Sequence, residues 1–185
     1  MKKQLTLGTL FIMILLLLSS CAAKEMIREE DMPGGIRDWS RDDAPKLIKS
    51  KVIDHFECEF KTNLRTEEGY DYFVMEMVRE KEHAACRLQA YSDWALPMDL
   101  VFDAPLSALD DLQKLADQYD LARYNGQDRQ VNGLPPNLGA RLRVVYASGE
   151  RIYASDNSTS VLDYRAENAI QAFFQDLARS QGALE

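Results

Sequence analysis

The residue whose position implies the clearest chemistry is Cys21. The chain starts with the cations Lys2 and Lys3, continues with an almost uninterrupted apolar run over Leu10–Leu18, and then places two serines before the cysteine. A positive start, an apolar middle and small residues at a cleavage point are the pattern of a secretory signal peptide. Because a cysteine stands at the end of this pattern, its sulfur is the candidate for covalent modification.

The segment Leu18-Ser19-Ser20-Cys21 resembles the lipobox of bacterial lipoproteins. The resemblance implies that a diacylglyceryl group is attached to the sulfur of Cys21 and that residues 1–20 are removed. The rest of the chain would then lie on the outer side of the cell membrane. Two or three acyl chains, at about 0.8 kcal/mol per buried methylene, anchor a protein stably. An uncleaved membrane-spanning segment is the less favoured alternative, because the apolar run is shorter than the ~20 residues that cross a bilayer.

Other residues that could do chemistry are few. His55 and His83 are the two histidines, and no sequence motif of a metalloprotease, a redox dithiol, a serine hydrolase or a phosphate-binding loop occurs. We expect His55 on the solvent face of a strand and His83 at a turn, where a histidine is usually just solvated. A Ser-His-Asp triad assembles from distant positions, so the sequence leaves it open without indicating one. We therefore predict no catalytic residue, no cofactor and no enzyme.

Acidic side chains offer one weak metal hypothesis, a calcium site. The candidates are the stretch Asp156-Asn157-Ser158 and the helix face that carries Asp110, Asp111 and Asp117. The ligand spacing of an EF-hand is absent, and scattered carboxylates on a helix usually form a solvated face. We therefore predict no metal site.

The stretch from residue 124 to residue 139 is rich in turn-forming residues and is the candidate binding loop. Turn chemistry is the favoured explanation, since asparagine and glycine tolerate positive φ and proline stiffens the chain. The functional alternative is a binding rim for a peptide, glycan or protein partner, because ordered loops on a rigid scaffold often carry recognition. The residues of this possible binding loop are Tyr124, Asn125, Asn132, Leu134 and Pro135.

The charge balance argues against nucleic acid as a partner. The chain has 22 basic and 30 acidic residues, and loss of Lys2 and Lys3 with the signal peptide lowers its net charge from −8 to −10. An acidic surface without a basic stripe repels phosphates and anionic headgroups. We therefore expect membrane attachment through the lipid on Cys21 alone.

The chain divides into four parts by composition and pattern. Residues 1–20 are the predicted signal peptide, 21–50 a charged tether, 51–180 a single globular domain and 181–185 a tail. Trp39 is the aromatic exception within the tether, and we expect it to fold back on the domain rather than rest at the membrane interface.

Apolar alternation and helical periodicity predict the elements of the domain. Strands are expected at 52–61, 70–79, 83–92, 96–102, 142–146 and around 152–153, with Val52, Phe56, Cys58 and Phe60 facing the core from the first. The first helix follows Pro105, with its apolar face at Leu109, Leu112, Leu115, Ala116 and Tyr119. The last begins between residues 160 and 163, with the stripe Ala166, Ala169, Ile170, Phe173 and Leu177 and Phe174 beside it.

This order of elements, βββ(β)αββα, predicts an α+β fold with an antiparallel sheet of about six strands and both amphipathic helices packed on one face. Cys58 and Cys86 would then lie on strands separated by a third, with their Cα atoms about 9 to 10 Å apart, which is too far for a disulfide. We favour two buried free thiols, and a disulfide stays the alternative.

Most of the mature domain resembles a group of uncharacterised lipoproteins from clostridia and related Firmicutes. The resemblance lies in Ala44-Pro45-Lys46, Phe56-Glu57-Cys58-Glu59-Phe60, 118–122, 124–126, 132–135 and 146–154. It implies a location and no activity, so no functional residue is carried over. We rank a binding or protein-interaction module first, a structural or accessory envelope protein second and a hydrolytic enzyme third.

Overall fold

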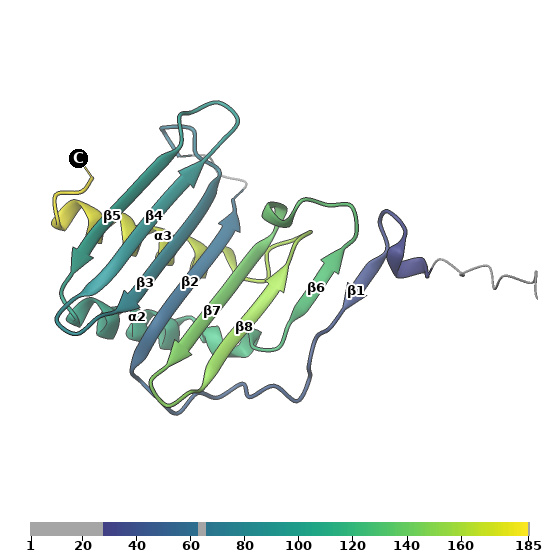
Figure 1. The fold of residues 1–185 in the computed structure, drawn as a ribbon, viewed down its shortest axis with the longest axis horizontal. Coiled ribbons are helices and arrows are strands. Elements are labelled where there is room, and N and C mark those ends of the chain that lie inside the picture. Colours follow the sequence, from purple (N-terminus) through teal and green to yellow (C-terminus); the bar gives the residue numbers. More distant parts are fainter. Residues whose placement is uncertain (1–27, 63–65, 185) are drawn as a thin grey trace, which may run out of the picture.

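A computed structural model describes residues 28–62 and 66–184 (Figure 1). Cys21 and the signal segment lie outside these residues, so the lipidation of Cys21 stays a prediction. Within the described ranges, no helix is both long and apolar enough to cross a membrane.

One layer of the domain is an eight-stranded sheet in the order β1-β6-β8-β7-β2-β3-β4-β5 (Figure 1). Neighbouring strands are antiparallel except for the parallel pair β6 and β8. The strands are β1 (Ile36–Asp38), β2 (Ile53–Lys61), β3 (Tyr72–Arg79), β4 (Ala84–Tyr91), β5 (Met98–Ala104), β6 (Asp128–Val131), β7 (Ala140–Tyr146) and β8 (Arg151–Asp156). The predicted α+β class is confirmed, but the sheet has eight strands rather than about six.

Two α-helices, α2 (Ser107–Gln118) and α3 (Tyr164–Ser180), lie across the same face of this sheet (Figure 1). Three short 3-10 helices complete the described part, η1 (Glu29–Asp31), η2 (Leu121–Tyr124) and η3 (Pro136–Leu138). The core lies between the helices and the sheet. Phe56 of β2 and Phe174 of α3 are fully buried there, with their rings stacked at a centroid distance of 6.1 Å.

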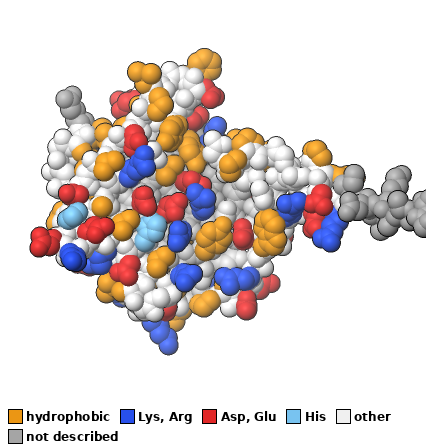
Figure 2. All heavy atoms as spheres, viewed as in Figure 1, with side chains coloured by type: hydrophobic (Ala, Val, Ile, Leu, Met, Phe, Trp, Pro, Cys, Tyr) orange, Lys and Arg blue, Asp and Glu red, His pale blue; other side chains and the backbone are white. Residues whose placement is uncertain are grey.

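The opposite face of the sheet is open. Figure 2 shows it as a mixture of acidic, basic and hydrophobic side chains. Arg87 of β4 donates two hydrogen bonds to Asp99 of β5, and Arg141 of β7 lies within 3.2 Å of both Glu57 and Glu59 of β2. Cross-strand pairs of opposite charge stabilise a solvated sheet face, since each charge meets its partner directly across the ladder.

The prediction that Val52 faces the core at the start of the first long strand is wrong. It is 45% exposed, whereas Ile53 is fully buried. The pairing of β2 with β7 shifts register between Ile53 and His55. Such a bulge inserts one extra residue and moves the preceding side chains to the other face. Phe56, Cys58 and Phe60 face the core as predicted.

The range 21–50, expected to be a tether, contributes to the domain over its described part. Its strand β1 pairs with β6, and both strands fall in stretches predicted to be without strands. Ala44 and Ile48 are buried. Trp39 donates its backbone N–H to Asp128, but its side chain is 52% exposed. The domain therefore begins before residue 51.

Asn125 holds this early segment against the sheet. Its side-chain amide donates to the carbonyl of Pro45 at 2.8 Å, and its side-chain oxygen accepts from the backbone N–H of Tyr153 at 2.9 Å. The next residue, Gly126, has φ +86°, and a Cβ there would lie 2.4 Å from the Cβ of Ala44. A larger residue at position 126 would push the segment away.

Cys58 on β2 and Cys86 on β4 are separated by β3, and both are buried free thiols. The favoured prediction is confirmed. Burial raises the pKa of both thiols, to about 12 for Cys86, because an apolar surrounding disfavours the charged thiolate. Neither thiol is suited to nucleophilic chemistry, which requires the thiolate.

We predict that Asn125→Ala destabilises the fold by about 1–3 kcal/mol, because it removes a buried side chain whose amide bonds both the carbonyl of Pro45 and the backbone N–H of Tyr153. The matched control is Asn137→Ala, whose side chain is exposed and for which a change within about 0.5 kcal/mol is expected. The measurement is the urea midpoint of unfolding for each variant. Equal midpoints for the two variants would contradict the structural role of Asn125.

Candidate functional site

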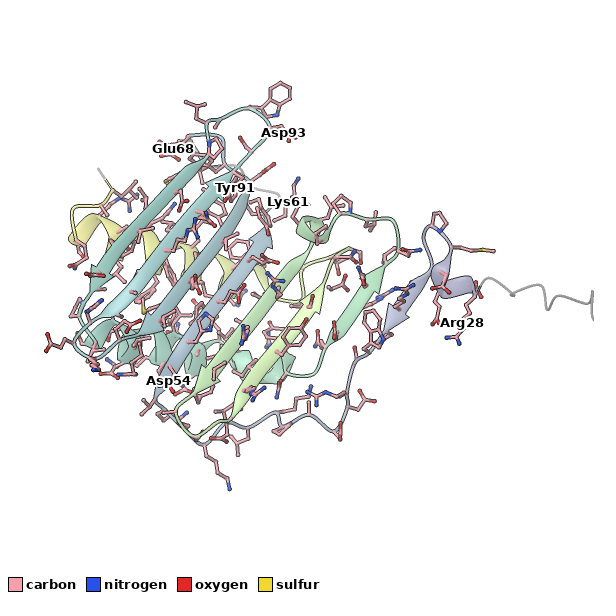
Figure 3. The ribbon with its side chains drawn as sticks, in the orientation of Figure 1. Arg28, Asp54, Lys61, Glu68, Tyr91 and Asp93 are labelled. Atoms are coloured by element: carbon pink, nitrogen blue, oxygen red, sulfur yellow. The ribbon has the colours of Figure 1, made fainter. Side chains whose placement is uncertain are left out.

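Two hollows lie at one end of the sheet, one on each side of Lys61, the last residue of β2. Figure 3 shows Lys61 close to Tyr91 and Asp93 at this end. The larger hollow, the Glu167 cavity, has a volume of about 480 Å³ and is lined by Lys61, Thr62, Leu138, Ser158, Thr159, Ser160, Leu162, Tyr164, Glu167 and Asn168. The smaller, the tyrosine hollow, has a volume of about 370 Å³ and is lined by Lys61, Asp71, Tyr72, Val74, Tyr91, Ser92, Asp93 and Asn137.

A polar turn after β8 forms one wall of the Glu167 cavity. One carboxylate oxygen of Asp156 accepts hydrogen bonds from the backbone N–H groups of Ser158 and Thr159, at 2.7 and 3.2 Å, and from the hydroxyl of Ser158. Gly139 allows this turn to approach closely, since a Cβ there would lie 1.8 Å from the carbonyl oxygen of Asp156. The turn therefore depends on an acceptor at position 156 and on glycine at position 139.

Glu167 forms the buried side of the cavity. It lies in the first turn of α3 and is 6% exposed. The hydroxyl of Ser160 donates to its Oε1, and the same hydroxyl oxygen accepts from the backbone N–H of Leu162 at 3.0 Å. Burial raises the pKa of Glu167, an effect that the Ser160 hydrogen bond opposes and the charge of Asp163 reinforces.

The second carboxylate oxygen of Glu167 faces no protein donor in the described part of the chain. The side-chain atoms that are fully enclosed there without a hydrogen-bond partner are Gln113 Oε1 and Arg141 Nε. An atom without a hydrogen-bond partner is either enclosed by protein or in contact with solvent. Glu167 Oε2 has no partner among the described residues and is not enclosed, so solvent or a ligand in the cavity can reach it. No cationic side chain of the described residues forms an ion pair with this carboxylate.

The tyrosine hollow is shallower and belongs to the open face of the sheet. Tyr72 and Tyr91 pair across β3 and β4 with ring centroids 6.0 Å apart. Burial, together with the charge and hydrogen bond of Glu59, raises the pKa of Tyr72. Lys61 lies 3.9 Å from Asp71 in this hollow, so its ammonium group is only loosely paired there.

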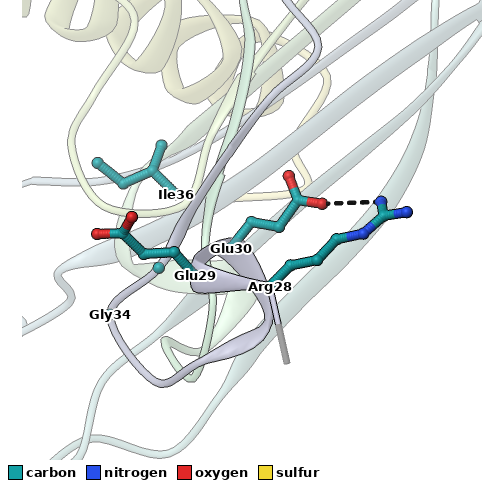
Figure 4. A pocket seen from close by; sticks show the side chains of 6 residues that line it. Arg28, Glu29, Glu30, Gly34 and Ile36 are labelled. Carbon is teal, nitrogen blue, oxygen red and sulfur yellow. Dashed lines mark hydrogen bonds and ion pairs between the residues drawn. The ribbon is translucent and has the colours of Figure 1, made fainter. Parts of the chain in front are cut away.

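A third hollow of about 500 Å³ lies between η1 and β1 (Figure 4). The guanidinium of Arg28 is paired with Glu30 at 3.2 Å, and η1 has no buried residue. Because none of the described residues that line this hollow is a buried polar group, we do not treat it as a candidate site.

The predicted binding loop is divided by the structure. Tyr124 and Asn125 are buried, and the hydroxyl of Tyr124 accepts from the backbone N–H of Asp163 at 2.9 Å. Both side chains are therefore committed to internal contacts and cannot form a binding rim.

The other three predicted loop residues remain near the surface. Asn132 donates its side-chain amide to the carbonyls of Asp31 and Met32, whereas Leu134 and Pro135 are exposed. None of the five predicted residues lines either hollow beside Lys61. The loop reaches these hollows two and three residues after Pro135, through Asn137 and Leu138.

The histidines singled out in the sequence lie elsewhere, whereas Asp156 belongs to the polar turn at the wall of the Glu167 cavity. His55 pairs with Glu76 on the open face at 2.9 Å, and His83 lies 3.3 Å from Asp103. Over residues 28–62 and 66–184, no three His, Cys, Asp or Glu side chains come together as a metal site.

Comparison of the chain with models of protein families, with curated proteins and with solved structures found no match. Function is therefore inferred from the residues of the Glu167 cavity and from the lipobox pattern.

Proposed function

We propose that this chain is a lipid-anchored extracytoplasmic binding module and that the Glu167 cavity is its ligand site. The observation that carries the proposal is the accessible oxygen of a buried carboxylate within a cavity of about 480 Å³. Ligand sites are typically concave, of a few hundred Å³, and carry a small number of convergent polar groups. The hydroxyls of Ser158 and Thr159 donate to Asp156, so their oxygens are left to accept from a ligand, and Asn168 adds a side-chain amide.

A binding role is better supported than a hydrolytic one. The Ser160 hydroxyl donates to a carboxylate, as a nucleophile would to its base. Its oxygen, however, already accepts the N–H of Leu162, which ties Ser160 to the start of α3. Neither histidine lines the cavity. Ser160 therefore serves to orient Glu167.

The proposed anchor on Cys21 predicts where the protein fractionates. Expressed in a bacterium, the full chain should appear in the membrane fraction, and mass spectrometry of its first peptide should find a fatty-acylated Cys21. The Cys21→Ser variant should lack the acyl groups, and Cys58→Ser should not alter fractionation. An unmodified Cys21 in the wild-type chain would contradict the anchor.

The proposed site predicts which of two similar leucines affects binding. Leu138, 38% exposed, lines the Glu167 cavity, whereas Leu134, 39% exposed in the same segment, does not. The probe is a soluble enzymatic digest of bacterial cell wall, which contains both glycan and peptide fragments. Added to the ¹⁵N-labelled full chain in detergent micelles, it should shift amide resonances of residues 158–168.

A Leu138→Trp substitution should abolish these shifts by filling the cavity mouth, and Leu134→Trp should leave them unchanged. If Leu134→Trp abolishes the shifts and Leu138→Trp does not, the ligand binds at the predicted loop and not in the Glu167 cavity. No shift at residues 158–168 with the wild-type chain would count against this cavity as the site.

A further inference from the structure

The protein contacts of the buried Glu167 carboxylate do not fully replace the hydration that it loses on burial. The residue is 6% exposed, and the one hydrogen-bond donor to its carboxylate in the described residues is the neutral hydroxyl of Ser160. A buried carboxylate is stable when a cation or several donors replace its lost hydration. One oxygen remains accessible, so the group is equipped to receive a further donor from the cavity.

The surroundings of this oxygen favour a cationic donor. The negative charge of Asp163 makes the ionised form of Glu167 less favourable. Glu167 and Asp163 are both acidic, so their combined charge attracts a positive ligand group to the buried side of the cavity. A metal ion is a poor match, because no cluster of three suitable ligands occurs among the described residues.

The opposite charge is supplied by Lys61. It lines the same cavity, its side chain is 37% exposed, and its nearest carboxylate, that of Asp71, lies 3.9 Å away. An ammonium at this distance from its partner can exchange that contact for a ligand carboxylate with little loss. The ammonium lies in the tyrosine hollow, but because Lys61 lines both hollows its flexible side chain can turn to a ligand carboxylate in the Glu167 cavity.

We propose that the Glu167 cavity binds a small zwitterion of the peptide class, a free amino acid or a short peptide, with its ammonium on Glu167 and its carboxylate on Lys61. The hydroxyls of Ser158 and Thr159 and the amide of Asn168 would meet its backbone groups. This inference rests on the proposed function and adds the chemical class of its ligand.

The test is isothermal titration of the full chain in detergent micelles with three probes: L-alanyl-L-alanine, its N-acetyl derivative and its C-terminal amide. Acetylation removes the ammonium and amidation removes the carboxylate, while the rest of the molecule is kept. Each change should weaken binding at least about tenfold, as expected for loss of a hydrogen bond to a charged group.

Two variants assign the charges to their protein partners. Glu167→Gln keeps an acceptor for Ser160 and should bind the dipeptide and its N-acetyl derivative equally weakly. Lys61→Gln should bind the dipeptide and its amide equally weakly. Asp176→Asn, in the last part of α3, is the matched control and should bind all three probes like the wild-type chain. Thermal unfolding of each variant checks that it folds.

The comparison of probes on the wild-type chain needs no variant. Equal affinity for the dipeptide and its N-acetyl derivative would overturn the proposal, as would no binding of the dipeptide at all. If either result occurs while the cell-wall digest still shifts residues 158–168, a ligand of another class, such as a neutral glycan, occupies the cavity and the proposed function stands. If the digest gives no shift, the proposed site fails as well.

Discussion

The packing of α3 against the sheet is the interaction on which the rest of the structure depends. Ala166, Ile170, Phe174 and Ala178 are fully buried and recur every four residues along the helix. Phe174 reaches Phe56 at the centre of the sheet. Burying one such aromatic side chain contributes about 1.5–3 kcal/mol, so this stripe fixes the rotation of the helix about its axis.

That rotation carries Glu167 to the edge of the core. It precedes Ile170 by three residues and Phe174 by seven, a spacing that places all three on one face of a helix. Because packing fixes the rotation of the helix, the backbone of Glu167 stays at the edge of the core. Its position near the N-terminus of α3 and its hydrogen bond from Ser160 offset part of the desolvation cost. The packing thus holds a carboxylate, with one accessible oxygen, at the wall of a cavity.

Local pattern predicted the elements whose faces differ clearly in polarity. Strands β2, β3, β4 and β7 alternate buried and more exposed residues, so their existence could be predicted from the sequence. Strands β1 and β6, of three and four residues, have no fully buried position. Their pairing joins segments about ninety residues apart, which no local periodicity reports.

The candidate site was missed for a related reason. Phe173 and Phe174 are adjacent, so the helical pattern allowed two stripes, and the prediction centred on Phe173. In the structure Phe174 is buried and Phe173 is partly exposed. The two rings pack edge to face, with their centroids 5.6 Å apart. The apolar face predicted for this helix does not include Glu167, so the sequence pattern did not predict that Glu167 is buried. The sequence does place a carboxylate three residues before Ile170, on the same face of the helix. This spacing indicates a buried carboxylate only once the rotation of α3 is known.

A ¹³C NMR pH titration of the Glu167 carboxyl carbon tests directly whether this group is buried and receives a ligand cation. Without ligand, the account predicts a pKa above the usual range for glutamate, because burial disfavours the ionised form. With saturating L-alanyl-L-alanine the pKa should fall, since a bound ammonium stabilises the carboxylate. An ordinary pKa that the dipeptide leaves unchanged would show a solvated side chain without a bound cation, and would contradict the account.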